Sequence, residues 1–135
     1  MNFEKSLSEL KGARVDVSPG NGYPEPGMAS IELLFANGTR LTAEYWRLGI
    51  DGGAGISSFD HQQKYGLPAP IDAVKKLGET LRDKLVTNTL LDHKTGDLLF
   101  DFDGNITLQV LNFTSYEIWH IRFPDGTGEY SNYVK

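Results

Sequence analysis

The chain has 135 residues, of which 39% are hydrophobic and 11% aromatic, and this length predicts one globular domain over residues 1–135 with a stable core. Because cysteine is absent, disulfides, thiolate zinc sites and cysteine nucleophiles are excluded, and the cytoplasm is the expected compartment. The formal net charge of −5, without any basic stripe, disfavours nucleic acid as a direct partner.

The N-terminal part of the chain predicts a short helix and then a strand. Residues 1–6 are polar and lack the features of an export signal, and no run of about eighteen apolar residues occurs, so neither export nor membrane contact is expected. Apolar residues at helical spacing predict a helix over residues 3–11: Phe3, Leu7 and Leu10. Residues 13–17 alternate as a half-buried strand, and the Gly- and Pro-rich residues 18–27 predict a surface loop.

Two segments repeat one pattern, in which an apolar strand is followed by an Asn-Gly or Asp-Gly turn and a β-rich return. These segments are residues 33–38 and 98–104. The pattern is the strongest short-range signal for a β-hairpin. The copies begin about 65 residues apart and fit either an internal repeat of two related β units or convergence on a favourable hairpin.

The first copy predicts a hairpin with strands over residues 31–36 and 39–48. Strict alternation along the second strand places Leu41 and Trp46 on opposite faces. A further strand is expected over residues 54–59, after a glycine-rich turn.

The main helix is predicted over residues 70–85. Pro70 suits its first turn, Asp72 complements its positive end, and its apolar residues form a single stripe: Ile71, Val74, Leu77, Leu81 and Leu85. Gly78 costs about 1 kcal/mol relative to alanine inside a helix. It fits either the close approach of a strand or a tolerated surface glycine.

The rest of the chain predicts four successive strands: residues 86–91, 97–102, 105–113 and 116–123. Short connections demand antiparallel neighbours, so these strands should form a meander, and residues 129–134 predict a final edge strand. The predicted fold class is α+β: an antiparallel β-meander sheet of hairpins with one main α-helix packed on a face and a short N-terminal helix.

The densest group of polar side chains lies in residues 57–70, in the expected connection between a strand and the main helix. Asp60 beside His61 suggests a carboxylate that orients an imidazole, with Ser57 or Ser58 as the nucleophile of a small hydrolase. The alternative is structural, with Asp60 and His61 holding the loop backbone. Because no serine elbow motif occurs, no catalytic residue and no enzymatic activity is predicted.

Metal and phosphate chemistry are not indicated. The three histidines are scattered and lack metal-ligand spacing: His61, His93 and His120. Asp101, Asp103 and Asn105 alternate, but this pattern is typical of a hairpin turn. The glycine-rich residues 20–22 and 52–55 lack the strand–glycine–helix order of a phosphate loop, so no cofactor and no metal is predicted.

Three motifs carry a resemblance to a known group of proteins: GNITLQV at residues 104–110, YEIWHI at 116–121, and FDH with YGLP within 59–68. They resemble small, hairpin-rich bacterial immunity proteins of polymorphic-toxin systems, including contact-dependent growth inhibition. The resemblance implies a cytoplasmic protein that is not an enzyme. Such a protein binds a cognate toxin, often a nuclease, and blocks its active site or substrate surface.

Nuclease toxins of this kind are basic, so exposed carboxylates are the natural contact residues of an acidic inhibitor. We expect the toxin to contact these positions: Asp60, His61, Tyr65, Asp101, Asp103 and Glu117. Pairing with the predicted edge strand 129–134 is a second route. The alternatives are a binding module for another partner, or one that forms weak homo-oligomers through a sheet edge.

Overall fold

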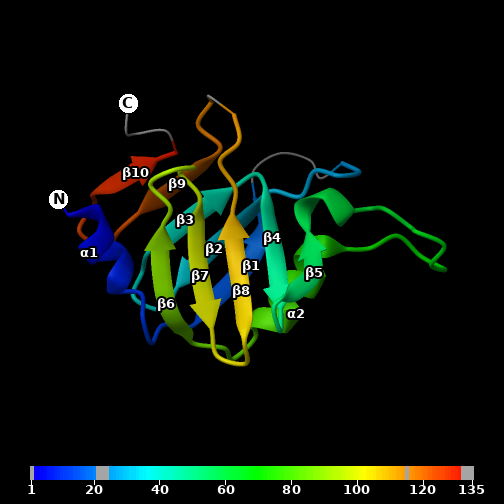
Figure 1. The fold of residues 1–135 in the computed structure, drawn as a ribbon, viewed down its shortest axis with the longest axis horizontal. Helices are drawn as coiled ribbons and strands as arrows, with labels where there is room; N and C mark the ends of the chain where they lie inside the picture. The colour runs from blue at the N-terminus through cyan, green and yellow to red at the C-terminus, as the bar shows by residue number, and fades with distance from the viewer. Residues whose placement is uncertain (1, 21–24, 115, 132–135) are drawn as a thin grey trace.

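The computed structural model describes residues 2–20, 25–114 and 116–131. Its strands form two antiparallel sheets of five strands each, and the apolar core lies between the sheets (Figure 1). The first sheet consists, in spatial order, of β1 (Val15–Pro19), β2 (Ile31–Phe35), β3 (Arg40–Ala43), β9 (Trp119–Arg122) and β10 (Gly128–Tyr130). The second consists of β5 (Gly53–Ser57), β4 (Trp46–Ile50), β8 (Ile106–Val110), β7 (Leu98–Phe102) and β6 (Val86–Leu91). The predicted α+β class is confirmed.

Two helices close the open sides of this sandwich. The main helix α2 (Ala73–Leu81) packs against the edge strands β1 and β5, and the short helix α1 (Phe3–Ser8) packs against β6 (Figure 1). Each begins at a side-chain cap, Asn2 for α1 and Asp72 for α2. A Cβ added to Gly78 would lie 3.7 Å from Cβ of Val17 in β1, an ordinary contact, so the strand is close without requiring glycine.

Both helices are shorter than the ranges predicted for them, residues 3–11 and 70–85. The helix α2 starts only after its cap at Asp72, so Pro70 precedes it. It ends at Leu81 because the next residue leaves the helical conformation and Asp83 has a φ of 61°. The described residues contain no helix that combines the length and the apolar character needed to cross a membrane.

The strand predicted over residues 39–48 is wrong as a single element. The chain bends at Glu44 and Tyr45, so β3 belongs to the first sheet and β4 to the second. Because of the bend, the inward–outward alternation of side chains in β3 does not continue in register into β4. Trp46 is therefore fully buried, as Leu41 is, and not on the opposite face.

The predicted meander is confirmed for β6, β7 and β8, but the strand predicted over residues 116–123 does not continue it. The part of it that forms a strand, β9, pairs with β3 in the first sheet. The connection of eight residues, 111–118, is long enough to cross between the sheets. The strand predicted over 54–59 ends as β5, followed by the 3₁₀ turn η1 (Ser58–Asp60). The edge strand is present as β10, and residues 132–134 of its predicted range lie outside the described residues.

The two halves of the chain repeat one arrangement. Each half begins with a helix, α1 or α2, and continues with a three-stranded meander, β1-β2-β3 or β6-β7-β8. Each then sends its last two strands across to the other half, so that β4 pairs with β8 and β9 pairs with β3. Both sheets therefore contain strands from both halves. This arrangement favours the internal repeat over a chance similarity of two hairpins.

The repeat extends to individual hydrogen bonds. Trp46 and Trp119 are the first residues of the two crossing strands, β4 and β9. The indole N–H of Trp46 donates to the carbonyl oxygen of Ala29 at 2.7 Å, and that of Trp119 donates to the carbonyl oxygen of Gly96 at 3.0 Å. Ala29 and Gly96 both lie two residues before the second strand of their meander. The two tryptophans thus fix the crossings in the same way.

Two buried serines complete the equivalence. The main-chain N–H of Trp46 donates to Oγ of Ser58 at 3.2 Å, and that of Trp119 donates to Oγ of Ser131 at 3.3 Å. Each serine follows the last strand of its half, β5 or β10, and both are buried. The crossing strands are therefore anchored at their first residue by the same pair of contacts.

The halves differ mainly in two connections. The β3–β4 connection has only two residues, Glu44 and Tyr45, whereas the equivalent β8–β9 connection spans residues 111–118. The β1–β2 connection spans residues 20–30, whereas the equivalent β6–β7 connection spans 92–97. Insertions in a repeated framework commonly carry binding surfaces, so the described residues of the connections 20–30 and 111–118 are candidates for a binding site.

Candidate functional site

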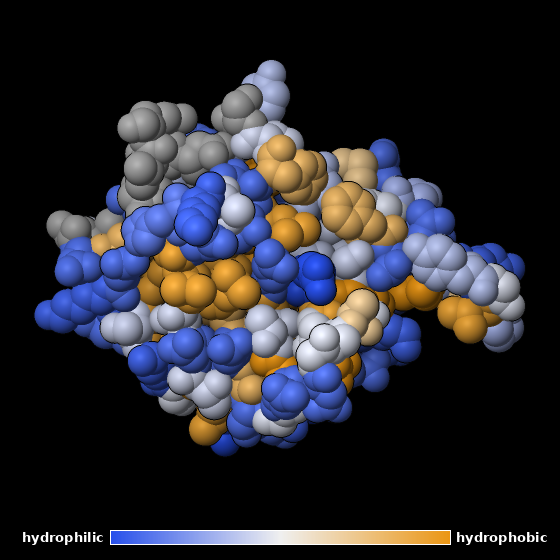
Figure 2. All heavy atoms as spheres, viewed as in Figure 1, coloured by the Kyte–Doolittle hydropathy of each residue, from blue (hydrophilic) through white to orange (hydrophobic). Residues whose placement is uncertain are grey.

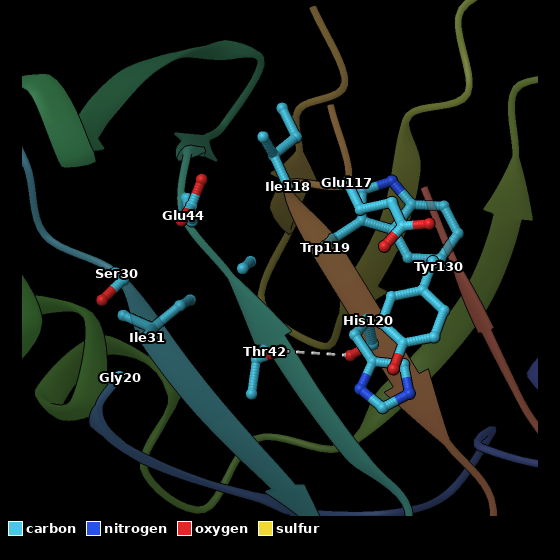
Figure 3. A pocket seen from close by; sticks show the side chains of 11 residues that line it. Gly20, Ser30, Ile31, Thr42, Glu44, Glu117, Ile118, Trp119, His120 and Tyr130 are labelled. Carbon is cyan, nitrogen blue, oxygen red and sulfur yellow. Dashed lines mark hydrogen bonds between the residues drawn. The ribbon is translucent and has the colours of Figure 1, made fainter. Parts of the chain in front are cut away.

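A pocket of about 270 Å³ opens on the outer face of the first sheet, at the end where β3 leaves it (Figure 3). Both long connections contribute to its wall, the first through Gly20 and Ser30 and the second through Glu117 and Ile118. We call it the acidic pocket and define it by its main polar and aromatic residues together with Ile118: Thr42, Glu44, Glu117, Ile118, His120 and Tyr130.

Cross-strand pairing builds the floor of the acidic pocket. Thr42 of β3 is paired with His120 of β9, which is paired in turn with Tyr130 of β10, so the three side chains form one row. The His120 and Tyr130 rings are stacked, with centroids 4.1 Å apart and planes 10° from parallel. The Thr42 hydroxyl donates to the carbonyl oxygen of His120 at 3.5 Å (Figure 3). The floor is therefore a flat aromatic pair.

Two exposed carboxylates, those of Glu44 and Glu117, stand at one end of the pocket, with Ile118 between them (Figure 3). The main chain fixes their positions. The N–H of Glu44 donates to the carbonyl oxygen of Ile118 at 3.0 Å, and the N–H of Ile118 donates to Oγ of the buried Ser131 at 2.7 Å. The two side chains thus project from a rigid backbone into solvent.

The imidazole of His120 forms one half of the floor. Partial burial and the nearby Arg122 guanidinium lower its pKa below the ordinary value of 6.5, and the Glu117 carboxylate acts in the opposite direction. The imidazole is therefore uncharged at neutral pH. The imidazole therefore adds no positive charge opposite the two glutamates, and Arg122 is a cation close to the floor.

The predicted residues Asp60 and Tyr65 lie together, away from the acidic pocket. The Tyr65 hydroxyl donates to Oδ1 of Asp60 at 2.9 Å, which raises the pKa of Tyr65. The other oxygen of Asp60 accepts hydrogen bonds from the N–H and the hydroxyl of Ser57, at 2.9 and 3.3 Å. These bonds close a capping box around η1. Asp60 therefore holds the backbone of this turn.

His61 also makes a structural contact. Its side chain is buried, and Nδ1 accepts a hydrogen bond from the N–H of Ala73, the first residue of α2, at 3.1 Å. Ser58 is buried and hydrogen-bonded to the main chain of Trp46. Asp60 is hydrogen-bonded to Ser57 and Tyr65, and His61 to Ala73, so the contacts of the structural alternative are formed.

The predicted residues Asp101 and Asp103 lie in a third place, on β7 and the turn that follows it. Oδ1 of Asp101 accepts a hydrogen bond from the Thr107 hydroxyl at 2.8 Å, and Oδ1 of Asp103 accepts one from the N–H of Leu85 at 2.8 Å. Asn105 has a φ of 59°, as a tight hairpin turn requires. The interpretation of this segment as a turn is confirmed. The described residues contain no group of three or more His, Cys, Asp or Glu side chains that could hold a metal ion.

The six predicted contact residues are thus distributed over three places, and only Glu117 lies in the acidic pocket. Sequence reasoning missed Glu44, His120 and Tyr130 as members of one site. Alternation along residues 118–123 places His120 and Trp119 on opposite faces, which is a signal that His120 points away from the core. No local signal reports the pairing of β3 with β9, which brings Glu44 close to Glu117.

Comparisons of the chain with protein-family models, with curated proteins and with solved structures found no match.

Proposed function

We propose that the protein is a non-enzymatic binding protein whose acidic pocket receives a basic side chain of a protein partner. The observation that carries this proposal is the pair of glutamates at one end of a pocket whose floor is the stacked His120 and Tyr130 rings. Sites for drug-sized ligands measure roughly 300–1,000 Å³, and the acidic pocket measures about 270 Å³. This size favours a single inserted side chain over a free small molecule.

The chemistry of the pocket suits arginine better than lysine. A guanidinium is planar and pairs with a carboxylate through two parallel hydrogen bonds, and it also stacks on aromatic rings. Glu44 and Glu117 supply the carboxylates, and Tyr130, which is 47% exposed, supplies an accessible ring. The net charge of −5 adds long-range attraction for a basic partner and speeds the encounter.

The partner we propose is a cognate bacterial toxin with a basic nuclease domain. The protein binds it in the cytoplasm and blocks its active site or substrate surface. The resemblance to immunity proteins supports this choice, because the YEIWHI motif contributes Glu117 and His120 to the acidic pocket. The proposal requires no cofactor and no contact with nucleic acid or membrane.

The proposal is tested with the protein encoded immediately upstream of this chain's gene, the position expected for a cognate toxin. Both proteins are purified, and binding is measured by calorimetry at low and at physiological ionic strength. We expect a tight one-to-one complex that salt weakens and that abolishes the toxicity of the partner. The absence of a complex would contradict the proposal.

Charge-neutralising variants locate the contact. Glu44→Gln and Glu117→Gln should each raise the Kd by about tenfold, because each leaves a basic group of the partner without its carboxylate. The matched control is Glu9→Gln, which removes an exposed carboxylate at the end of α1, outside the pocket. If all three variants bind the partner as tightly as the unmodified protein does, the acidic pocket is not the contact site.

A further inference from the structure

A cluster of three aromatic rings lies at the same end of the sandwich as the acidic pocket. The centroid of the Tyr45 ring lies 5.5 Å from that of Phe59 and 4.8 Å from that of Phe113, and the centroids of the two phenylalanine rings are 6.3 Å apart. Phe59 is 46% exposed and Phe113 is 57% exposed. Figure 2 shows hydrophobic side chains at the surface near the end of the sandwich where β4 begins and β8 ends. We call these three residues the aromatic cluster.

The aromatic cluster and the acidic pocket are built from the same two segments. Tyr45 directly follows Glu44 in the bend between β3 and β4, and Phe113 and Glu117 both belong to the connection 111–118. Each segment therefore presents a carboxylate to the pocket and an aromatic ring to the cluster. These two segments therefore link the pocket and the cluster along the chain.

The third ring, that of Phe59, is held in place by its neighbours. Oγ of Ser57 accepts the N–H of Phe59 at 3.2 Å, within the capping box that Asp60 completes. Ser58 attaches the turn to the main chain of Trp46 with hydrogen bonds of 3.2 and 3.4 Å. A ring fixed before binding loses little conformational freedom when a partner covers it.

The internal repeat shows that the connection 111–118 is longer than the crossing requires. The first half makes the equivalent crossing with two residues, Glu44 and Tyr45, and both crossings are anchored by the same tryptophan and serine contacts. The additional residues of the second crossing carry the exposed Phe113 and Glu117. Aromatic side chains are enriched in protein interfaces relative to the rest of the protein surface.

We infer that the partner's contact surface continues from the acidic pocket onto the aromatic cluster, and that the same basic partner places an apolar side chain on the rings of Phe59 and Phe113. This inference rests on the proposed function. Two observations point to that partner. The negative charge of Glu44 and Glu117 complements a basic protein, and the segments 44–45 and 111–118 each carry both a pocket residue and a cluster residue. A few anchor residues, aromatic ones prominent among them, supply most of the affinity of an interface.

The inference is tested by titrating the purified upstream-encoded protein with Phe59→Ser and Phe113→Ser. Each variant should raise the Kd by about tenfold or more, as expected for aromatic anchors. The matched control is Leu90→Ser, which removes a side chain that is 53% exposed on β6, at the far edge of the second sheet. The control should bind as the unmodified protein does, and thermal unfolding of each variant verifies its fold.

A salt titration separates the two parts of the surface. Phe113→Ser should weaken binding by the same factor at every salt concentration, whereas Glu117→Gln should reduce the dependence on salt. If Phe59→Ser and Phe113→Ser bind like Leu90→Ser while the glutamate variants are weakened, the inference is overturned and the proposed function stands. If the unmodified protein does not bind, both are overturned. If Phe59→Ser unfolds at a lower temperature than the unmodified protein, Phe59→Leu is used in its place, because leucine removes the aromatic ring but keeps an apolar side chain.

Discussion

Replacing Ser131 by alanine would show how strongly the acidic pocket depends on its buried support. Oγ of Ser131 accepts two main-chain N–H groups, that of Ile118 at 2.7 Å and that of Trp119 at 3.3 Å. The side chain is only 1% exposed, so water does not reach it in the folded protein. The variant therefore leaves two buried donors without an acceptor.

The size of the effect follows from these two bonds. A buried donor without a partner costs about 1–3 kcal/mol. The shorter bond to Ile118 contributes the larger share and the longer bond to Trp119 a smaller one. We expect Ser131→Ala to lower the free energy of unfolding by about 2–4 kcal/mol. The equivalent variant Ser58→Ala should cost less, about 1–2 kcal/mol, because Ser58 accepts a single N–H at 3.2 Å and its other hydrogen bond, to the carbonyl oxygen of Trp46, is long at 3.4 Å.

Urea unfolding followed by tryptophan fluorescence measures this difference, because Trp46 and Trp119 are both buried in the folded protein. With a denaturant dependence of about 1–3 kcal/mol/M, Ser131→Ala should lower the midpoint by about 1–2 M urea without a change in slope. The reasoning is refuted if Ser131→Ala costs less than about 0.5 kcal/mol, or if it costs no more than Ser58→Ala.

Three further predictions concern pH, chain connection and backbone packing. The pKa of His120 is lowered in the folded state, so the unfolded chain binds its proton more readily; stability should be constant above about pH 6.5 and fall as the pH drops through the folded pKa. Urea unfolding at several pH values measures this change in stability, and His120→Gln should make stability less dependent on pH. If the pH dependence of that variant is unchanged, other titratable groups cause it. Cleavage at a protease site inserted at Gly66, in the exposed connection before α2, should leave both halves in one particle, since each sheet contains strands of both; separate halves in gel filtration would contradict the internal exchange of strands. Gly128→Ala should lower the unfolding free energy by about 1–3 kcal/mol, because an added Cβ would collide with the main-chain oxygen of Ile121; unchanged thermal unfolding would show that β10 adapts without cost.

Local features of the fold were predictable because local interactions determine them. The turn of Asp103, Gly104 and Asn105 forms where the Asp-Gly pattern predicts a hairpin. The apolar stripe of the main helix is confirmed at Leu77 and Leu81, which are fully buried.

Features that depend on distant partners were not predictable. The sequence of residues 39–48 predicts one alternating strand, because neither Glu44 nor Tyr45, where the chain bends, is a typical turn residue. What fixes the bend is the burial of Trp46 and its bond to Ala29, which only the folded chain brings together. For the same reason Glu117 could be predicted as an exposed contact residue from its charge alone. Its neighbour Glu44 could not be predicted, because only the pairing of β3 with β9 brings the two together.

The exchange of strands between the halves also determines when this protein can fold during its synthesis. The strand β3 has its second neighbour in β9, so its outer edge stays unpaired until residues 119–122 have been made. The first half alone therefore leaves a row of open backbone groups, a surface that recruits other unpaired strands. Contacts between residues so far apart in the chain also slow folding. A ribosome that stops before residue 119 would consequently release a chain prone to aggregation, even though it contains every residue of the first meander.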